Sequence, residues 1–204
     1  MILYHGTTTD QLLGIMQEGI KPRGKKDSQW KDCPSHPDCV YLTNAYGFYY
    51  AGNAIADSGT MVIFEVEVDK ENLLPDEDFI EQAMRNTLQD EHEDYNVLAM
   101  TWEIRDHLEN YEQYWADSLA GLGNAAHRGR IAPHQIKRYA IIDDIGFTMV
   151  FDPVICLPNY SLMGAYYRNS MRWLFDPDVE LEECQMGRNE VFTELDRSGI
   201  KIVP

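Results

Sequence analysis

The sequence predicts an α+β fold, in which a β-sheet core is flanked by helices and followed by a C-terminal extension. Short apolar runs of strand length recur along the chain, and the clearest, residues 61–69, opens apolar and then alternates apolar with charged side chains. Between these runs, apolar residues recur at helical spacing, as from Phe79 to Leu88. The 204 residues, of which 44% are hydrophobic and 25% charged, suit a packed core.

The expected elements follow one another along the chain. A strand over residues 1–4 leads to a helix over residues 9–18, capped within Thr8-Thr9-Asp10 and ended by Gly19. We expect further strands over residues 40–43, 61–69, 139–142 and 145–151, and further helices after Asn44, after the capping residue Asp76, over residues 96–119 and over residues 161–174. Residues 21–38 read as a loop.

The chain is strongly acidic, with a formal net charge of -17 and a pI near 4.6. Such a field repels phosphate backbones, which argues against broad nonspecific nucleic-acid binding. The most basic segment is the loop over residues 21–38, which is either a solvated loop or a lid over an anionic ligand. No apolar run approaches the roughly 18 residues that span a membrane, and no secretory signal is visible, so we expect a cytoplasmic protein without a membrane partner.

The cysteines do not indicate a metal centre. Four are present, and the spacing from Cys33 through His36 to Cys39 is Cys-x5-Cys with a central histidine. A structural zinc site needs four ligands, and no fourth is apparent nearby. We therefore expect a proline-rich loop here and no bound metal.

Two short motifs contain the residues that we expect to form a functional site. Tyr4-His5-Gly6-Thr7 ends the first strand with a histidine and a glycine, and Val40-Tyr41-Leu42-Thr43 places a tyrosine in an equivalent position on the second strand. Their order and spacing, with the helices behind them, resemble the ADP-ribosyltransferase superfamily, of the diphtheria-toxin-like type. The stretch Arg128–Ile136 is similar to the Gly-x-Ile-x-Pro-x-x-Ile turn that closes the split sheet of that family. The resemblance covers roughly residues 1–150.

The resemblance implies a split β-sheet core, an ADP-ribosyltransferase-like domain over residues 1–153, and a C-terminal extension over residues 154–204 that packs on or beside it. It also implies NAD as co-substrate. His5 would hydrogen-bond the ribose beside nicotinamide, Gly6 would hold the carboxamide, and Tyr41 would line the pocket. One of Tyr46, Tyr49 or Tyr50 would stack on the ring, although core packing explains tyrosines equally well. The NAD-binding residues implied are His5, Gly6, Thr7, Tyr41, Thr43, Tyr49, Tyr50 and Arg128.

The sequence departs from the family at the third catalytic position. Many members place a glutamate before the final turn, whereas this chain has Ala126-His127-Arg128 there. His127 is the best match, and it could hydrogen-bond the ribose or take a proton, with Arg128 contacting the pyrophosphate. We expect this segment to run beside the first strand, and we expect His5 and Tyr41 to share one facing and one pocket. A glutamate from the acidic segment, such as Glu91, Glu93 or Glu103, is an alternative third member.

The function implied is NAD-dependent mono-ADP-ribosyl transfer to a protein or nucleic-acid acceptor, with release of nicotinamide. Small acidic proteins of this kind include bacterial toxins and viral modifiers of host proteins. The missing glutamate favours single transfer, hydrolysis by water, or a non-enzymatic interaction protein or acidic decoy. An RNA 2′-phosphotransferase is a further alternative that the acidity disfavours. Residues 154–204 would bear on acceptor choice through exposed aromatics such as Tyr166, Tyr167 and Trp173.

Overall fold

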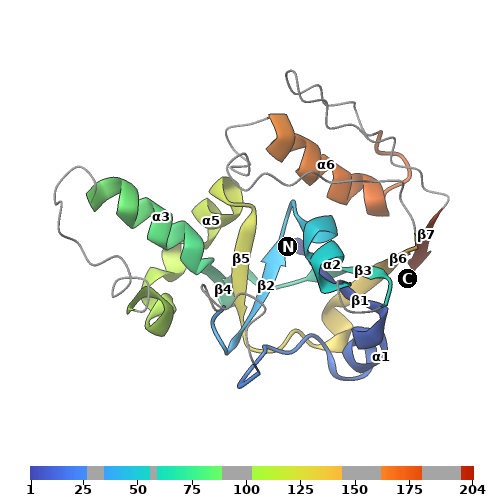
Figure 1. Ribbon diagram of the computed structural model, residues 1–204, viewed down its shortest axis with the longest axis horizontal. Coiled ribbons are helices and arrows are strands. Elements are labelled where there is room, and N and C mark those ends of the chain that lie inside the picture. The colour runs from blue at the N-terminus through green and yellow to red at the C-terminus, as the bar shows by residue number, and fades with distance from the viewer. Residues whose placement is uncertain (27–34, 56–58, 89–102, 144–161, 181–198) are drawn as a thin grey trace.

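A single antiparallel sheet forms the centre of the molecule (Figure 1). The computed structural model describes residues 1–26, 35–55, 59–88, 103–143, 162–180 and 199–204, without the side chains of residues 85–88 and 162–166. Within these residues the sheet has seven strands in the order β4-β5-β2-β1-β3-β6-β7. The α+β class predicted from the sequence is confirmed.

The sheet divides into two wings between β1 and β2. The strands, in sheet order, are β4 (Leu73–Pro75), β5 (Asn124–Arg128), β2 (Cys39–Thr43), β1 (Ile2–Thr8), β3 (Met61–Glu67), β6 (Ile136–Ile142) and β7 (Ile200–Val203). β1 pairs along its whole length with β3, but with β2 only through Tyr4 and Thr43. We call β4-β5-β2 the narrow wing and β1-β3-β6-β7 the wide wing.

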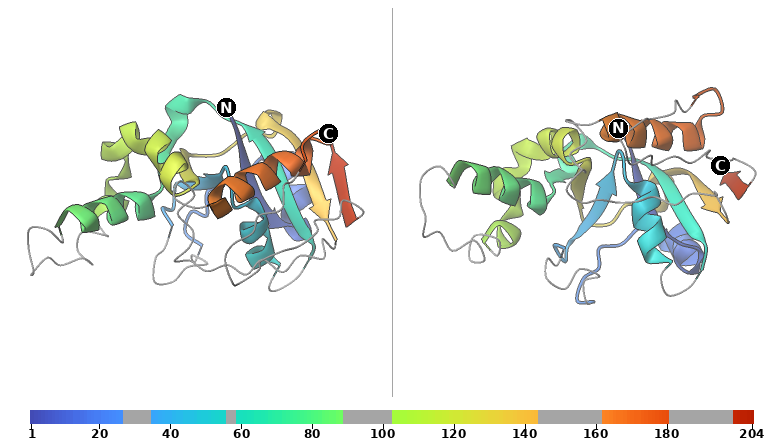
Figure 2. Two further views of the ribbon diagram at one scale, coloured as in Figure 1. Left: turned by 90° about the horizontal axis from the view of Figure 1, so that it is seen from above. Right: turned by 45° about the horizontal axis from the view of Figure 1, so that its top comes forward.

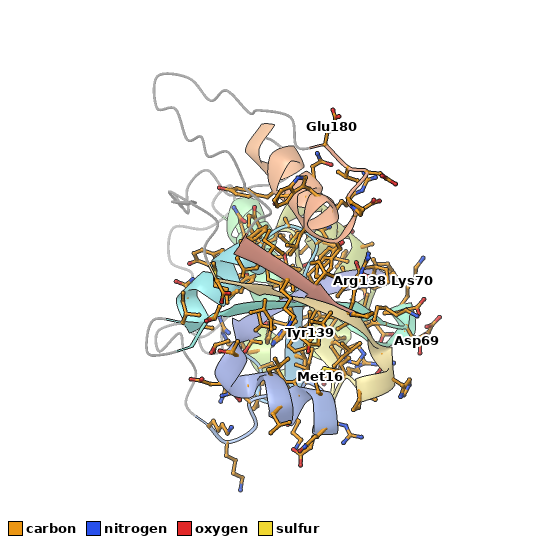
Figure 3. The ribbon with its side chains drawn as sticks, turned by 90° about the vertical axis from the view of Figure 1, so that its right-hand side faces the viewer. Met16, Asp69, Lys70, Arg138, Tyr139 and Glu180 are labelled. Atoms are coloured by element: carbon orange, nitrogen blue, oxygen red, sulfur yellow. The ribbon has the colours of Figure 1, made fainter. Side chains whose placement is uncertain are left out.

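Helix α1 (Thr9–Glu18) covers one face of the wide wing (Figure 3). The Thr8 side chain accepts the Asp10 N–H at 3.1 Å and caps the helix, and Gly19 ends it with φ of 81°, as its position in the sequence predicted. Ile15 packs into a buried cluster with Leu3 and Phe64. The short helix η3 (Pro133–Gln135) lies against α1 and leads into β6.

Helices α2 (Gly47–Ala54) and α6 (Leu162–Phe175) cover the opposite face (Figure 3). Alternation along β6 shows the two faces: Arg138 contacts the Phe175 ring of α6 at 5.2 Å, whereas Tyr139 packs on Phe64 beneath, with ring centroids 5.5 Å apart. Arg138 also pairs with the buried Glu65 at 2.9 Å. Met171 is fully buried in this second cluster.

The described part of residues 154–204 is integrated into this sheet and core. β7 extends the sheet by pairing antiparallel with β6. Ile142 lies opposite Ile200 at one end of this pairing, and Tyr139 lies opposite Val203 at the other. Tyr167 and Trp173 are only 3% and 7% exposed, so the expectation that they are exposed is wrong. They lie on the apolar face that α6 turns to its neighbours, and burial of that face stabilises the helix. The Tyr166 side chain lies outside the described residues.

Three helical segments lie beyond the narrow wing: α3 (Glu77–Leu88), η2 (Leu108–Tyr114) and α5 (Trp115–Gly121) (Figure 2). A further turn, η1 (Lys70–Asn72), precedes β4. Asp76 caps α3 as predicted, because its Oδ1 accepts the Asp78 N–H at 2.9 Å. The single helix expected over residues 96–119 is instead divided, with residues 103–106 helical before η2 and α5. Residues 145–151, where we expect a strand, lie outside the described residues, and so do Glu91 and Glu93.

In the part of the chain that the structure describes, none of the helices combines the length and apolar character needed to cross a membrane.

Candidate functional site

The point where the two wings part holds a cavity of about 620 Å³, a size typical of small-molecule sites. It is lined by residues from β1, α1, the segment after α1, β2, α2, the β4–α3 junction and the start of β5. Five residues of the predicted NAD site line it, namely His5, Gly6, Thr7, Tyr41 and Tyr50. Thr43, Tyr49, His127 and Arg128 are not among the described residues that line it.

His5 is held by the neighbouring strand. Its Nδ1 lies 3.1 Å from the Tyr41 carbonyl oxygen, and because a carbonyl only accepts, Nδ1 carries the proton. Burial lowers the pKa of His5 below its usual 6.5, and the hydrogen bond to Tyr41 offsets this in part. The ring is therefore neutral at pH 7, with Nε2 available as an acceptor on a residue that lines the cavity.

Tyr41 is fixed by a buried polar network. Its hydroxyl donates to Glu77 Oε2 at 2.5 Å and accepts the His36 N–H at 2.7 Å. Burial raises the pKa of Tyr41, and the charge of Glu77 raises it further, so the hydroxyl stays protonated. Arg105 Nη1 pairs with Glu77 Oε1 at 2.9 Å, with both side chains buried. This network ties β2 to the helices beyond the narrow wing.

The expectation that His5 and Tyr41 share one facing is wrong, because the strand register puts their side chains on opposite faces. The pairing of Tyr4 with Thr43 places Gly6, rather than His5, level with Tyr41. Both side chains nevertheless line the same cavity. This is because the strands part beyond the Tyr4–Thr43 pair, so the cavity lies between two strands and not over one face of the sheet.

The tyrosines of α2 have different roles. Tyr50 lines the cavity, and its hydroxyl accepts Asn124 Nδ2–H at 2.7 Å. Tyr49 packs edge-on against Tyr50, with ring centroids 5.4 Å apart. Tyr46 is 4% exposed and lies against Tyr167. Tyr50 is therefore the aromatic residue of α2 that can contact a bound ligand.

Thr43 has a structural role rather than a place in the cavity. Its Oγ1 donates to the Gly123 carbonyl at 2.7 Å and accepts the N–H groups of Ala45 and Tyr46. These contacts fix the turn between β2 and α2.

Gly6 is required by packing against α2. A Cβ on Gly6 would lie 2.4 Å from the Gly47 carbonyl oxygen and 2.5 Å from the Ala51 nitrogen, both of them backbone atoms. The sequence interpretation attributed the missing side chain to the approach of a ligand amide. The close approach in the structure is that of a helix.

We expect Gly6→Ala to lower the free energy of unfolding by at least about 2 kcal/mol, because backbone atoms must move to admit the methyl group. Urea denaturation measures this. Gly14→Ala is the matched control: no heavy atom lies within 4 Å of its added Cβ, so the helix should gain up to about 1 kcal/mol. Equal stabilities of Gly6→Ala and the wild type would contradict the packing account.

His127 and Arg128 do not lie where the sequence placed them. β5 pairs with β2 and β4, so the expectation that residues 126–131 run beside the first strand is wrong. The His127 side chain is 2% exposed, with Nδ1 3.4 Å from the Gly129 carbonyl oxygen. Arg128 pairs with Glu112 at 2.9 Å on the surface. Strand alternation along β5 turns the His127 side chain away from the cavity.

The structure adds residues that the sequence interpretation missed. Asp76, Glu77, Asp78 and Asn124 line the cavity together with His5 and Tyr41. The available signal was the run of three carboxylates after β4, which was interpreted as a helix cap and its first turn. Asn124 carried no signal, because its position depends on how β5 joins the sheet. Glu103 is exposed and is not among the described residues lining the cavity.

Comparison with protein-family models and with curated proteins found no match to this chain. Among the described residues, no group of three or more histidine, cysteine or acidic side chains could hold a metal ion. Cys33 of the Cys-x5-Cys stretch lies outside them. Cys39 is buried, and burial raises the pKa of its thiol to about 12, which leaves it in the unreactive thiol form. The functional argument therefore depends on the geometry of the cavity.

Proposed function

We propose that this protein is an NAD-dependent ADP-ribosyltransferase whose sheet is of the split type found in that superfamily. One observation carries the proposal. His5, oriented by the Tyr41 carbonyl, lines a cavity of about 620 Å³ together with Tyr41 and Tyr50, at the point where β1 and β2 separate. Two short motifs 36 positions apart in the sequence are thereby joined in one site.

The charges around the cavity match the two charged parts of NAD. Lys21, Arg23 and Lys26, from the segment after α1, give it a basic side. The three carboxylates of the β4–α3 junction give it an acidic side. A pyrophosphate suits the cations, and a planar pyridinium suits tyrosine faces beside carboxylates. This arrangement supports a dinucleotide with one anionic and one cationic part.

The basic side does not favour RNA phosphate chemistry. Arg23 is the one arginine among the described lining residues, and its guanidinium donates to the backbone carbonyls of Ser35, Gly24 and Lys26. Arg128 is paired on the surface. A phosphotransferase would need several free guanidinium groups at its site, so we favour NAD over an RNA phosphate.

In the proposed reaction, His5 Nε2 accepts a hydrogen bond from a hydroxyl of the ribose beside nicotinamide. Tyr50 and Tyr41 enclose the ring, and Lys26, with Lys21 of the Glu18–Lys21 pair, faces the pyrophosphate. Holding NAD in this way aligns the bond that breaks and stabilises positive charge developing on the ribose. The nucleophile is then a protein group, a nucleic-acid group or water.

The test combines binding with turnover. Calorimetric titration with NAD should give a saturable heat, and nicotinamide should be released when labelled NAD is incubated with the protein and cell-lysate protein as acceptor. Intact-mass analysis of the lysate then identifies the acceptor. Absence of binding at millimolar NAD would overturn the proposal. Binding without nicotinamide release would instead support a non-enzymatic NAD-binding protein.

A further inference from the structure

The acidic side of the cavity contains one carboxylate that makes no ion pair with a described cation. Glu77 is committed to Tyr41 and Arg105, and Asp78 is more than half exposed and pairs with Arg105 at 3.3 Å. Asp76 is 6% exposed, and its Oδ1 accepts the Asp78 N–H at 2.9 Å. No described lysine or arginine lies in ion-pair contact with it. An isolated buried carboxylate is costly, so its presence in a cavity indicates a use.

The strand register places Asp76 opposite Asn124. β4 and β5 pair Pro75 with Ala125, so Asp76 and Asn124 are the positions directly beyond the last pair of the two strands. Ser118 joins their backbones, because its Oγ accepts the Asp76 N–H at 2.9 Å and donates to the Asn124 carbonyl at 2.8 Å. Ser118 thus links the two positions through their backbones.

Asn124 independently indicates a ligand. It is 8% exposed and lines the cavity, and its Nδ2–H donates to the Tyr50 hydroxyl. Its Oδ1 is buried without a hydrogen-bond partner. Buried acceptors in folded proteins are nearly always satisfied. An unsatisfied acceptor close to a buried carboxylate without an ion-pair partner marks a place for a donor group of a bound molecule.

We propose that Asp76 is the proton acceptor of the transfer step and takes the role for which the Ala126–Arg128 segment offers no glutamate. This inference rests on the proposed function. The bond from the ribose C1′ to the nicotinamide nitrogen breaks, and its electron pair neutralises the pyridinium. The acceptor nucleophile forms the new bond to C1′ and loses its proton to Asp76 Oδ2, from which the proton passes to solvent. Asn124 Oδ1 accepts a hydrogen bond from the bound substrate beside it.

The environment of Asp76 suits a base. Burial raises the pKa of its carboxyl well above the usual range, and the charges of Glu77 and Asp78 raise it further, while the hydrogen bond from the Asp78 N–H and the charge of Arg105 oppose the rise in part. A carboxylate with a raised pKa is a stronger base than an exposed one and therefore accepts a proton from the nucleophile more readily. Glu77 fits this role less well, because both of its oxygens already accept hydrogen bonds.

The experiment compares Asp76→Asn, Asp76→Ala and the wild type in nicotinamide release from labelled NAD and in calorimetric NAD binding. Asparagine keeps an oxygen that can cap α3, so the fold should persist. We expect Asp76→Asn to lower kcat at least about 100-fold and to change the Kd for NAD less than about threefold. Asp106→Asn makes the same change at an exposed position outside the cavity and should retain wild-type turnover.

Chemical rescue separates a catalytic from a structural role. Formate should raise the turnover of Asp76→Ala at least about tenfold by supplying a carboxylate in the vacated space, whereas sodium chloride of equal ionic strength should not. Wild-type turnover in Asp76→Asn, or a folded Asp76→Ala that formate does not rescue, overturns the assignment. If Asp76→Ala does not fold, the Asp76→Asn result decides alone. Failure of the wild type to bind NAD overturns the proposed function instead.

Discussion

Replacing His5 with alanine is expected to lower nicotinamide release from NAD at least about 100-fold, while the free energy of unfolding changes by only about 1 kcal/mol. The large effect on activity and the small effect on stability follow from the different contacts of the two ring nitrogens. Nδ1 makes one hydrogen bond to the Tyr41 carbonyl, whereas Nε2 is available to the cavity. Steady-state kinetics and urea denaturation of the same preparation measure the two effects.

The control for His5 is His134→Ala, a change at an exposed residue outside the cavity that should alter neither quantity. Burial holds the pKa of His5 below 6.5, so the neutral ring persists at pH 7. Both the activity and the stability that depend on neutral His5 should therefore be present above pH 6.5 and be lost as the pH falls through the lower, folded-state pKa. Full activity in His5→Ala, or its unfolding, would make His5 a structural residue.

Replacing Arg105 with alanine is expected to lower the free energy of unfolding by about 3–5 kcal/mol, the largest stability effect that we predict. Arg105 and Glu77 have side chains only 6% and 4% exposed, and they pair at 2.9 Å. Without Arg105, Glu77 would be a buried charge whose remaining partners are the Tyr41 hydroxyl and the His36 N–H. Because Glu77 also positions Tyr41, NAD binding should weaken in the same variant.

Two further variants test this explanation. Arg128→Ala breaks an exposed pair with Glu112 and should lower the free energy of unfolding by less than about 1 kcal/mol. The double variant Arg105→Ala/Glu77→Gln removes the unpaired charge and should recover part of the loss. Burial already raises the folded-state pKa of Glu77 above its usual value, and losing Arg105 raises that pKa further, so the defect should shrink as the pH falls through the folded-state pKa. A loss for Arg105→Ala no larger than that for Arg128→Ala would contradict the burial argument.

Local signals in the sequence located much of the fold. The Thr8 cap and the left-handed Gly19 define α1 within neighbouring residues, and Asp76 caps α3 by bonding two positions ahead. Apolar alternation identified β3, and the two strand-end motifs correctly named His5 and Tyr41 as residues of one cavity. Such features are predictable because hydrogen bonds and side-chain periodicity act over a few residues.

The tertiary structure decided which distant segments meet. Asp76 and Asn124 are 48 positions apart, and only the pairing of β4 with β5 makes them neighbours. The same pairing turns His127 away from the cavity and into a buried position, contrary to the place in the site that the sequence predicted for it. The predicted exposure of Tyr167 and Trp173 was likewise wrong, because the sequence alone does not show whether a sheet covers an aromatic side chain. Short-range signals in the sequence predicted the local elements and five of the residues that line the cavity, namely His5, Gly6, Thr7, Tyr41 and Tyr50. Strand register, which depends on burial summed over the whole sheet, determined the other residues of the site.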